Sequence, residues 1–215
     1  RLAFIAERCC DKVVLDLGCL DETALIKRDS AHWLHGRIAQ VARQVVGVDA
    51  SDQLPPKGLI TGPNARIHRG DATNINPVFL DGVAIDMVVA GEFIEHLDNP
   101  LHFLTTLREV LPGRELILST PNGLCFGNTL MGMIRREVQH RDHLANFTFK
   151  TLNTLCERAG LQEWEIRPYQ FYATEMILRT SGLQRTLAMS VQALIRVVER
   201  LFPLLSFGYI VVARL

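Results

Sequence analysis

The amino-acid sequence predicts an α/β fold built on a seven-stranded, mostly parallel sheet with helices on both faces. Short apolar runs alternate with segments of helical periodicity, a pattern typical of a parallel sheet covered by helices. Hydrophobic residues make up 48% and charged residues 21% of the 215 positions, so the chain can bury a substantial core. At this length we expect one domain, spanning residues 1–215.

Five strands and two helices are expected in the first part of the chain. The strands are expected at residues 12–17, 45–49, 65–69, 85–90 and 115–119; most of them are short apolar runs. A helical pattern of apolar residues occupies positions 31–44. A second helix is expected at 101–111, because Asn99-Pro100 is a helix start signal.

The pattern changes after residue 123. A long connection over 123–146 has partial helical character at 129–138, and a helix at 148–159 is expected to end at Gly160. Two further strands are expected at 163–168 and 208–213, with an apolar helical segment at 174–201 between them. The complete pattern is that of a Rossmann-like sheet with a helical insertion, about residues 173–203, before the last strand.

Charge and cysteine content narrow the expected partners and compartment. The net formal charge is zero, which argues against a nucleic acid as the main partner. Five scattered cysteines without a CxxC pair favour a reduced, cytoplasmic chain. No apolar stretch is long enough to span a bilayer, because charged residues such as Arg196 and Glu199 interrupt the late apolar region. The chain begins at Arg1 and not at Met, so an upstream segment is left open.

Acidic residues and a glycine follow three of the predicted strands. Asp16 and Gly18 end the first strand, Asp49 ends the second and Asp71 follows the third. Ligands of open α/β sheets bind outside the carboxyl ends of the strands, so these residues are expected to meet at one edge. A glycine allows close backbone approach, and an ionised carboxylate such as Asp49 can accept hydrogen bonds from both hydroxyls of a ribose. Each residue alone is more often a turn residue, a helix cap or a solvated side chain, so the prediction depends on the ordered set.

Several segments resemble the class I S-adenosylmethionine-dependent methyltransferases. The matching segments run from residue 13 to about 161 and are VLDLGC, VVGVDAS, GDATNI, IDMVVAGEFIEHLDNP, LREVLPGRELILSTPN and FTFKTLNTLCERAGL. The chain is most similar to the broad group that includes ubiquinone-type O-methyltransferases and methyltransferases of sugars and natural products. The resemblance implies S-adenosyl-L-methionine as the cofactor.

The resemblance also implies which positions contact the cofactor. Those implied to line its methionine part are Asp16, Gly18, Gly91 and Glu92. Asp49 is implied to bind the ribose, and Asp71, with Ala72 beside it, the adenine amino group.

The first motif departs from the family pattern at one position. Leu20 stands where a second glycine is usual, and the segment that follows is longer and more polar than the usual turn into a helix. A leucine restricts the backbone and could narrow the approach to the carboxylate end of the cofactor. The sequence also lacks the Gly-x-Gly-x-x-Gly turn that carries pyrophosphate in nicotinamide enzymes, which favours the methyl donor over a dinucleotide.

Two histidines are the candidate catalytic residues. His96 follows the fourth strand, and His143 precedes FTFKTL on a loop that covers the acceptor in the resembling family. Either imidazole could take a proton from an acceptor hydroxyl near neutral pH; the alternative is that His96 supports a loop and His143 is solvated. His140 is a weaker candidate, and no metal site is expected, since His32 and His35 lack a third ligand at suitable spacing.

The leading hypothesis is methyl transfer to a small-molecule hydroxyl, in small-molecule biosynthesis. The alternatives are an N- or C-methyltransferase of a sugar or antibiotic precursor and, because of Leu20, a non-catalytic S-adenosylmethionine-binding subunit. The late helical segment is expected to be a packed cover. A lid over the acceptor, a homodimer interface and a membrane-surface contact are its other possible roles, because arginines flank its apolar residues.

Overall fold

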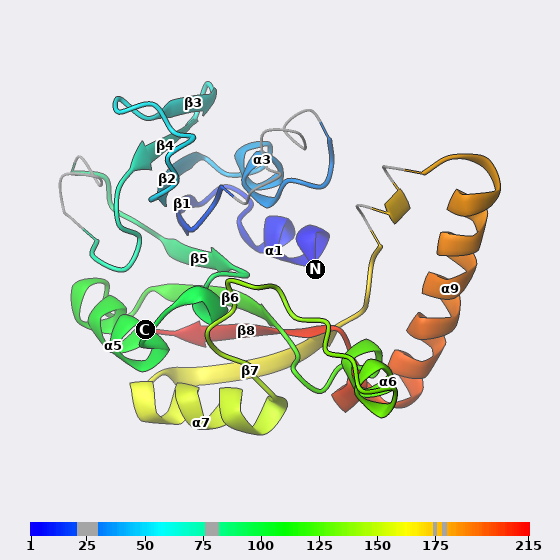
Figure 1. The fold of residues 1–215 in the computed structure, drawn as a ribbon. Coiled ribbons are helices and arrows are strands. Elements are labelled where there is room, and N and C mark those ends of the chain that lie inside the picture. The colour runs from blue at the N-terminus through cyan, green and yellow to red at the C-terminus, as the bar shows by residue number, and fades with distance from the viewer. Residues whose placement is uncertain (21–29, 76–81, 174–175, 178–179) are drawn as a thin grey trace.

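The computed structural model describes residues 1–20, 30–75, 82–173, 176–177 and 180–215, and an eight-stranded sheet forms its centre (Figure 1). The strand order is β3-β4-β2-β1-β5-β6-β8-β7. The strands are β1 (Val13–Leu17), β2 (Gln44–Asp49), β3 (Leu59–Gly62), β4 (Ala65–Arg69), β5 (Met87–Gly91), β6 (Glu115–Pro121), β7 (Gln162–Tyr169) and β8 (Gly208–Arg214). Strands β4, β2, β1, β5 and β6 are parallel, whereas β3 and β8 run antiparallel to their neighbours.

The strand order reverses beside β1. The chain leaves β1 to form β2 on one side and later returns to form β5 on the other. All five residues of β1 are buried, as expected for a central parallel strand that is covered on both faces. The carboxyl ends of β1 and β5 therefore flank the crevice in which open α/β sheets bind ligands.

Helices cover both faces of the sheet (Figure 1). The helical elements are α1 (Leu2–Arg8), α3 (Leu34–Ala39), the 3-10 turn η1 (Ile94–His96), α5 (Pro100–Val110), α6 (Phe126–Met133), α7 (Phe149–Ala159), α9 (Gly182–Leu201) and the 3-10 turn η2 (Pro203–Leu205). Side chains of β1 alternate between two core layers: Leu15 packs with α5 and α7, and Val14 packs with α1 and α3.

The helix signals of the sequence are confirmed at two helices. Asn99 caps α5 by accepting a hydrogen bond from the backbone of His102, and Pro100 occupies the first turn. Thr148 forms a capping box at the start of α7. The same helix ends at Gly160, which has a left-handed φ of 69°.

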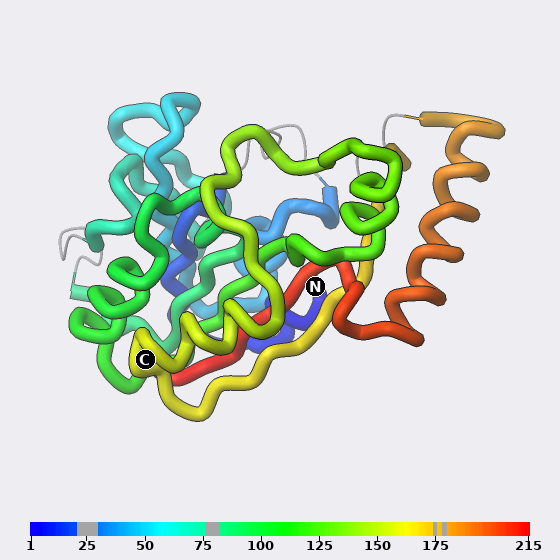
Figure 2. Tube along the Cα trace, turned by 60° about the horizontal axis from the view of Figure 1, so that its bottom comes forward, coloured from blue at the N-terminus to red at the C-terminus, as the bar shows by residue number. Residues whose placement is uncertain are grey.

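Helix α9 lies at the edge of the molecule and away from the sheet in both Figure 1 and Figure 2. Its inner face is held by side chains that accept backbone hydrogen bonds: Gln192 from Ala173 at 2.8 Å and Glu199 from Phe171 at 2.9 Å. Most of its apolar residues face outward. Among the described residues, no helix combines the length and the apolar character needed to cross a membrane.

The structure corrects several expected boundaries. The described sheet has eight strands and not seven, because the short, half-exposed β3 pairs with β4 as a hairpin without a marked apolar pattern. Helix α3 covers only part of the predicted 31–44, since turns flank it, and α6 begins and ends earlier than the expected 129–138. Helix α9 starts at Gly182; residues 174–175 and 178–179 of the predicted helix lie outside the described residues.

Candidate active site

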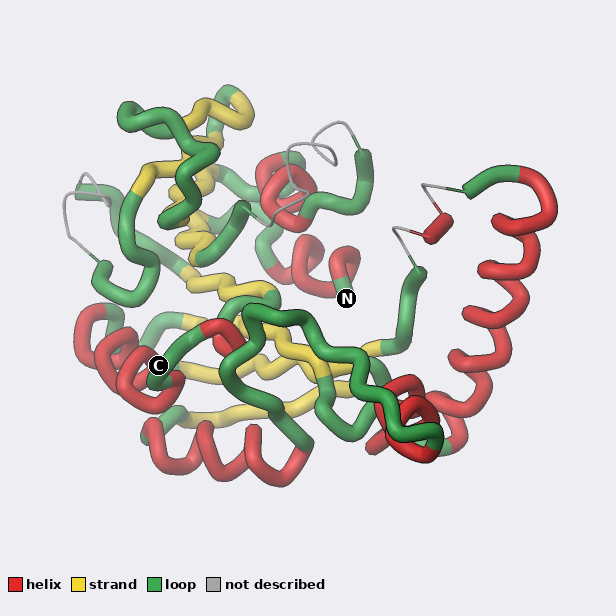
Figure 3. The backbone as a smooth tube through the Cα atoms, in the orientation of Figure 1, coloured by secondary structure: helices red, strands yellow, loops and turns green. Residues whose placement is uncertain are grey.

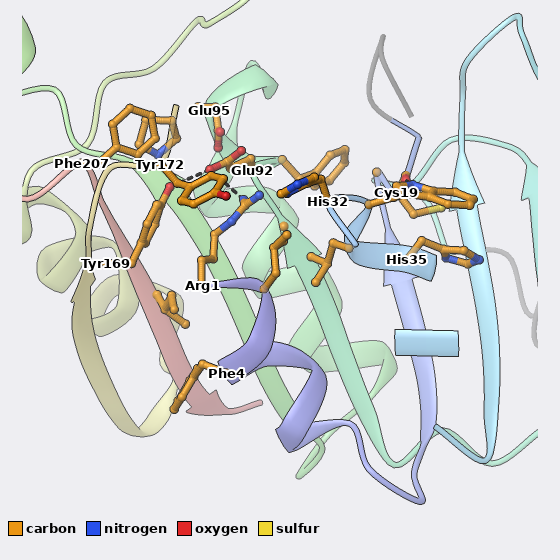
Figure 4. Close-up of a pocket in the computed structure, with 18 of the residues that line it drawn as sticks. Arg1, Phe4, Cys19, His32, His35, Glu92, Glu95, Tyr169, Tyr172 and Phe207 are labelled. Atoms are coloured by element: carbon orange, nitrogen blue, oxygen red, sulfur yellow. Dashed lines mark hydrogen bonds and ion pairs between the residues drawn. The ribbon is translucent and has the colours of Figure 1, made fainter. Parts of the chain in front are cut away.

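A cavity of about 1570 Å³ opens at the carboxyl ends of the parallel strands (Figure 4). It is larger than the usual range for a single small ligand, so it has room for a cofactor and an acceptor together. Every predicted site residue lines this cavity: Asp16, Gly18, Asp49, Asp71, Ala72, Gly91, Glu92, His96 and His143. The structure therefore brings together the residues that the sequence places after four different strands.

Two glycines are required where β1 and β5 end. Gly18 has a left-handed φ of 63°, and a Cβ atom added there would lie 2.2 Å from the ring of Phe93. A Cβ atom at Gly91 would lie 2.5 Å from the side chain of Leu34. Any larger residue would displace the segments that border the cavity.

Asp49 and Leu20 are joined by a hydrogen bond. The backbone N–H of Leu20 donates to Asp49 Oδ2, and the N–H of Ser51 donates to Asp49 Oδ1, both at 2.8 Å. The Leu20 side chain is buried in a core cluster with Trp33 and Leu54. The position expected to hold a second glycine thus supports Asp49 through its backbone, while its side chain packs into the core.

Asp16 is oriented toward a buried histidine. His35 Nδ1 lies 2.9 Å from Asp16 Oδ2, and His35 Nε2 lies 2.8 Å from the hydroxyl of Thr61. Asp16 is only 1% exposed and His35 is fully buried. The pair stabilises the end of β1, so contact of Asp16 with a cofactor stays a prediction.

Asp71 and Ala72 line the cavity directly after β4. Asp71 Oδ1 accepts hydrogen bonds from the backbone and the hydroxyl of Thr73, at 2.8 and 2.7 Å, which closes a turn after β4. The Asp71 residue is exposed and Ala72 is buried. This arrangement leaves an acidic group at the mouth of the cavity beside a small apolar surface.

Glu92 adopts a left-handed backbone with φ of 55°, which is uncommon for a residue with a side chain. Its carboxylate accepts a hydrogen bond from the Tyr169 hydroxyl at 2.6 Å and pairs with the Arg1 guanidinium at 2.7 Å (Figure 4). Burial raises the pKa of Tyr169 well above its ordinary value, and the Glu92 charge adds to the rise. Tyr169 therefore acts as a hydrogen-bond donor, a role that the sequence did not indicate.

The loop before α7 brings His143 to the end of β5. Figure 3 shows this connection between α6 and α7 as a long loop. Two backbone N–H groups, of Leu144 and Ala145, donate to the carbonyl of Glu95 at 2.8 and 3.0 Å. The rings of His96 and His143 lie 4.7 Å apart between centroids. The two predicted catalytic histidines are thus neighbours.

The surroundings affect the pKa of His143 and the tautomer of His96. Burial lowers the pKa of His143, and the nearby imidazoles of His96 and His140 lower it further. The ring nitrogen Nδ1 of His96 lies 3.0 Å from the carbonyl oxygen of Asp142, and its N–H donates a hydrogen bond to that oxygen. Nε2 of a neutral His96 then carries the lone pair.

Glu95 is a site residue that the prediction from sequence missed. It is 1% exposed, and neither of its carboxyl oxygens has a hydrogen-bond partner among the described residues. Burial raises the pKa of Glu95 to about 8, and the Glu92 carboxylate adds to the rise. Its position directly before His96 was the available signal.

Comparison with known families identifies a methyltransferase domain over residues 2–166. A probable S-adenosylmethionine-dependent methyltransferase of Mycolicibacterium smegmatis is 30% identical over 123 residues, which are 57% of this chain and 43% of the relative. A similarly named protein of Mycobacterium tuberculosis is 29% identical over 57% of this chain and 40% of its own length. The chain thus spans less than half the length of these relatives.

Solved structures share the fold at lower identity. A S-adenosylmethionine-dependent methyltransferase from Archaeoglobus fulgidus superposes with a TM-score of 0.55 at 16% identity, covering 100% of this chain and 95% of the other. The small RNA methyltransferase HEN1 has a TM-score of 0.61 at 17% identity, covering 100% of this chain and 24% of that chain. The plantazolicin methyltransferase BamL, in complex with a triazolic desmethylPZN analog and SAH, has a TM-score of 0.51 at 17% identity, covering 94% of this chain and 77% of that chain. At these identities, the likeness shows the fold alone.

Proposed function

The chain belongs to the class I S-adenosylmethionine-dependent methyltransferases, and on that premise we propose that it transfers a methyl group to a hydroxyl oxygen of a small molecule. The observation that carries this proposal is the family match together with a single cavity that gathers the proposed cofactor residues and two histidines.

The cavity residues fit S-adenosylmethionine. Asp49 accepts backbone hydrogen bonds from Leu20 and Ser51 and lines the cavity at the end of β2, and a carboxylate is a suitable acceptor for ribose hydroxyls. Asp71, exposed after β4, is the proposed acceptor for the adenine amino group. The backbone at Gly18 and Gly91 borders the proposed methionine end. When bound, the cofactor supplies a methyl carbon attached to a sulfonium, and the protein aligns the acceptor with it.

His96 and His143 are the proposed bases for the acceptor hydroxyl. The lowered pKa of His143 favours the neutral imidazole, the form that can take a proton. General-base assistance of this kind contributes on the order of 10²–10⁴-fold to rate. If neither histidine affects the rate, the alternative is an acceptor nitrogen or carbon. If no acceptor is turned over, the alternative is a cofactor-binding subunit.

A small molecule is favoured over a nucleic acid as the acceptor. The zero net formal charge lacks the basic excess of polyanion binders. HEN1, named for small RNA, is similar to this chain only at the level of the fold. The five free thiols are compatible with a reducing compartment, so a cytoplasmic location stays part of the proposal.

The outward face of α6 and α9 is the proposed contact with an anionic membrane surface. Its exposed apolar side chains, called here the α6–α9 face, are Leu130, Met133, Leu183, Leu187, Met189, Val191, Leu194, Val197 and Leu201. The described charges of α9 favour this occupant, because Arg185 and Arg200 are exposed while the acidic Glu199 is buried. Arg200 also lines the cavity, so the face lies beside its mouth.

Calorimetric titration with S-adenosylmethionine and with its demethylated product tests the cofactor assignment. We expect both to bind at about one per chain, with micromolar affinity. If neither S-adenosylmethionine nor its demethylated product binds at millimolar concentration, the proposal is contradicted.

Turnover on a panel of hydroxylated acceptors, measured with single His96→Ala and His143→Ala variants, tests the base. A full rate in both variants would remove that assignment.

A further inference from the structure

We propose that Glu95, His96 and His143 bind a divalent transition-metal cation at the acceptor end of the cavity. The three residues come from η1 and from the loop before α7, segments that are far apart in the sequence. The binding site itself is defined by these side chains. Only the role of the cation in methyl transfer rests on the proposed function.

The donor atoms already converge. One ligand atom from each of Glu95, His96 and His143 lies within 4.8 Å of the other two. Metal–nitrogen and metal–oxygen bonds are about 2.0–2.2 Å long, so small side-chain movements would bring all three to one ion. Two imidazoles and one carboxylate suit zinc, manganese, iron or cobalt and leave open positions for water or substrate.

The buried carboxylate of Glu95 is the second, independent observation. Buried polar atoms almost always have hydrogen-bond partners, yet both oxygens of Glu95 lack one within the described part of the chain. A cation beside Glu95 would satisfy these oxygens and stabilise the ionised form. The orphaned carboxylate thus indicates that a ligand is expected at this place.

The hydrogen bonds around the histidines also fit ligation. Histidine ligands commonly donate the second ring N–H to a backbone carbonyl, and His96 donates Nδ1–H to Asp142 in this way. The loop that carries His143 is fixed by two backbone bonds to Glu95 itself. One residue therefore supplies a ligand and also anchors the segment that supplies another.

The other histidine cluster does not show these properties. Asp16, Cys19 and His35 also lie close together, but both ring nitrogens of His35 are already bonded, to Asp16 and to Thr61. That cluster is satisfied without an ion. The site at Glu95 faces the cavity, where a coordinated acceptor hydroxyl would release its proton to water more readily. Ligation would use the lone pairs of both imidazoles, so in the metal-bound form the cation would replace the histidines in promoting loss of that proton.

Metal titration of the EDTA-treated protein tests the inference. We expect calorimetry with MnCl₂ or CoCl₂, without S-adenosylmethionine, to give about one site per chain. Glu95→Gln and His143→Ala should weaken binding by at least about a hundredfold, because loss of even an outer-shell partner of a ligand costs about tenfold to a hundredfold. The visible spectrum of the Co²⁺ form should change in the same variants. His102→Ala is the matched control, because His102 is an exposed histidine of α5 outside the cavity, and it should leave both readouts unchanged.

The outcomes separate this inference from the proposed function. Absence of a site for both ions, or binding that is unaffected in Glu95→Gln and His143→Ala, would overturn the metal site. If metal fails to bind while the demethylated cofactor binds normally, the proposed function stands alone. If metal binds while neither form of the cofactor does, the site stands and the proposed function fails. Circular dichroism of each variant shows whether it is folded.

Discussion

Gly18 combines a left-handed backbone with a neighbour that leaves no room for a side chain. A Cβ atom there would overlap the Phe93 ring, so Gly18→Ala must move the end of β1 or the segment after β5. We expect a loss of about 1–3 kcal/mol in the free energy of unfolding and at least about tenfold weaker binding of the demethylated cofactor. Urea unfolding and calorimetry measure the two effects.

Gly113 provides the matched control for this substitution. Its φ of 74° is also left-handed, but an added Cβ atom would meet nothing within 4 Å. Gly113→Ala should therefore cost only about 1–2 kcal/mol, from backbone strain, and leave cofactor binding unchanged. Equal binding losses in both variants would show that steric overlap at Gly18 does not shape the cavity.

Individual residues differ in how well the sequence predicts them. Gly18, Asp49 and Asp71 lie where strands end, so a one-dimensional pattern is enough to place them at one edge. Glu95 and Tyr169 are different, because their roles depend on burial and on partners distant in the chain. A carboxylate one residue before a predicted catalytic histidine is unremarkable until the structure shows that it is buried without a partner.

Helices and strands, like single residues, are predicted well where a local sequence pattern determines them and poorly where tertiary packing does. Strands β1, β5 and β6 are each built on a run of apolar residues, and the sequence predicts them close to their observed bounds. Helix α1 was missed because it has only seven residues, and β3 because a half-exposed edge strand carries no clear alternation. The position of α9 away from the sheet could not be predicted, since an apolar helix is ordinarily packed on its own core.

Helix α9 offers a test of the α6–α9 face. We expect the protein to sediment with vesicles of equal parts phosphatidylcholine and phosphatidylglycerol, and less with pure phosphatidylcholine, because arginines accompany the apolar residues. Leu187→Glu combined with Leu194→Glu should weaken binding by about tenfold or more. These leucines are 64% and 66% exposed, so the changes should not unfold the protein.

Ile60→Glu is the control for the vesicle test, because Ile60 is similarly exposed, at 68%, but lies on β3. It should sediment like the unchanged protein. Failure of the unchanged protein to bind anionic vesicles would contradict a membrane contact. A concentration-dependent dimer in analytical ultracentrifugation, lost in the double leucine variant, would assign the face to a second copy of the chain.

At the scale of the whole molecule, the buried cysteines lie in different parts of the core. Cys10 is exposed, whereas Cys9, Cys19, Cys125 and Cys156 are buried. Cys9 packs in the layer beneath α1 and α3, and Cys156 packs in the layer beneath α7. Burial raises the pKa of both of these thiols to about 12, which further suppresses the reactive thiolate.

The thiols therefore test the prediction that residues 1–215 form one domain. With Ellman's reagent in native buffer we expect one fast thiol, which Cys10→Ser removes, and four that react only through unfolding. In a cooperative domain the four slow thiols should accelerate together as urea is added, because opening either core layer exposes the sheet between them. Mass spectrometry after alkylation assigns each rate to its cysteine. If Cys9 becomes reactive at a lower urea concentration than Cys156, the two layers open separately and the prediction of one cooperative domain is wrong.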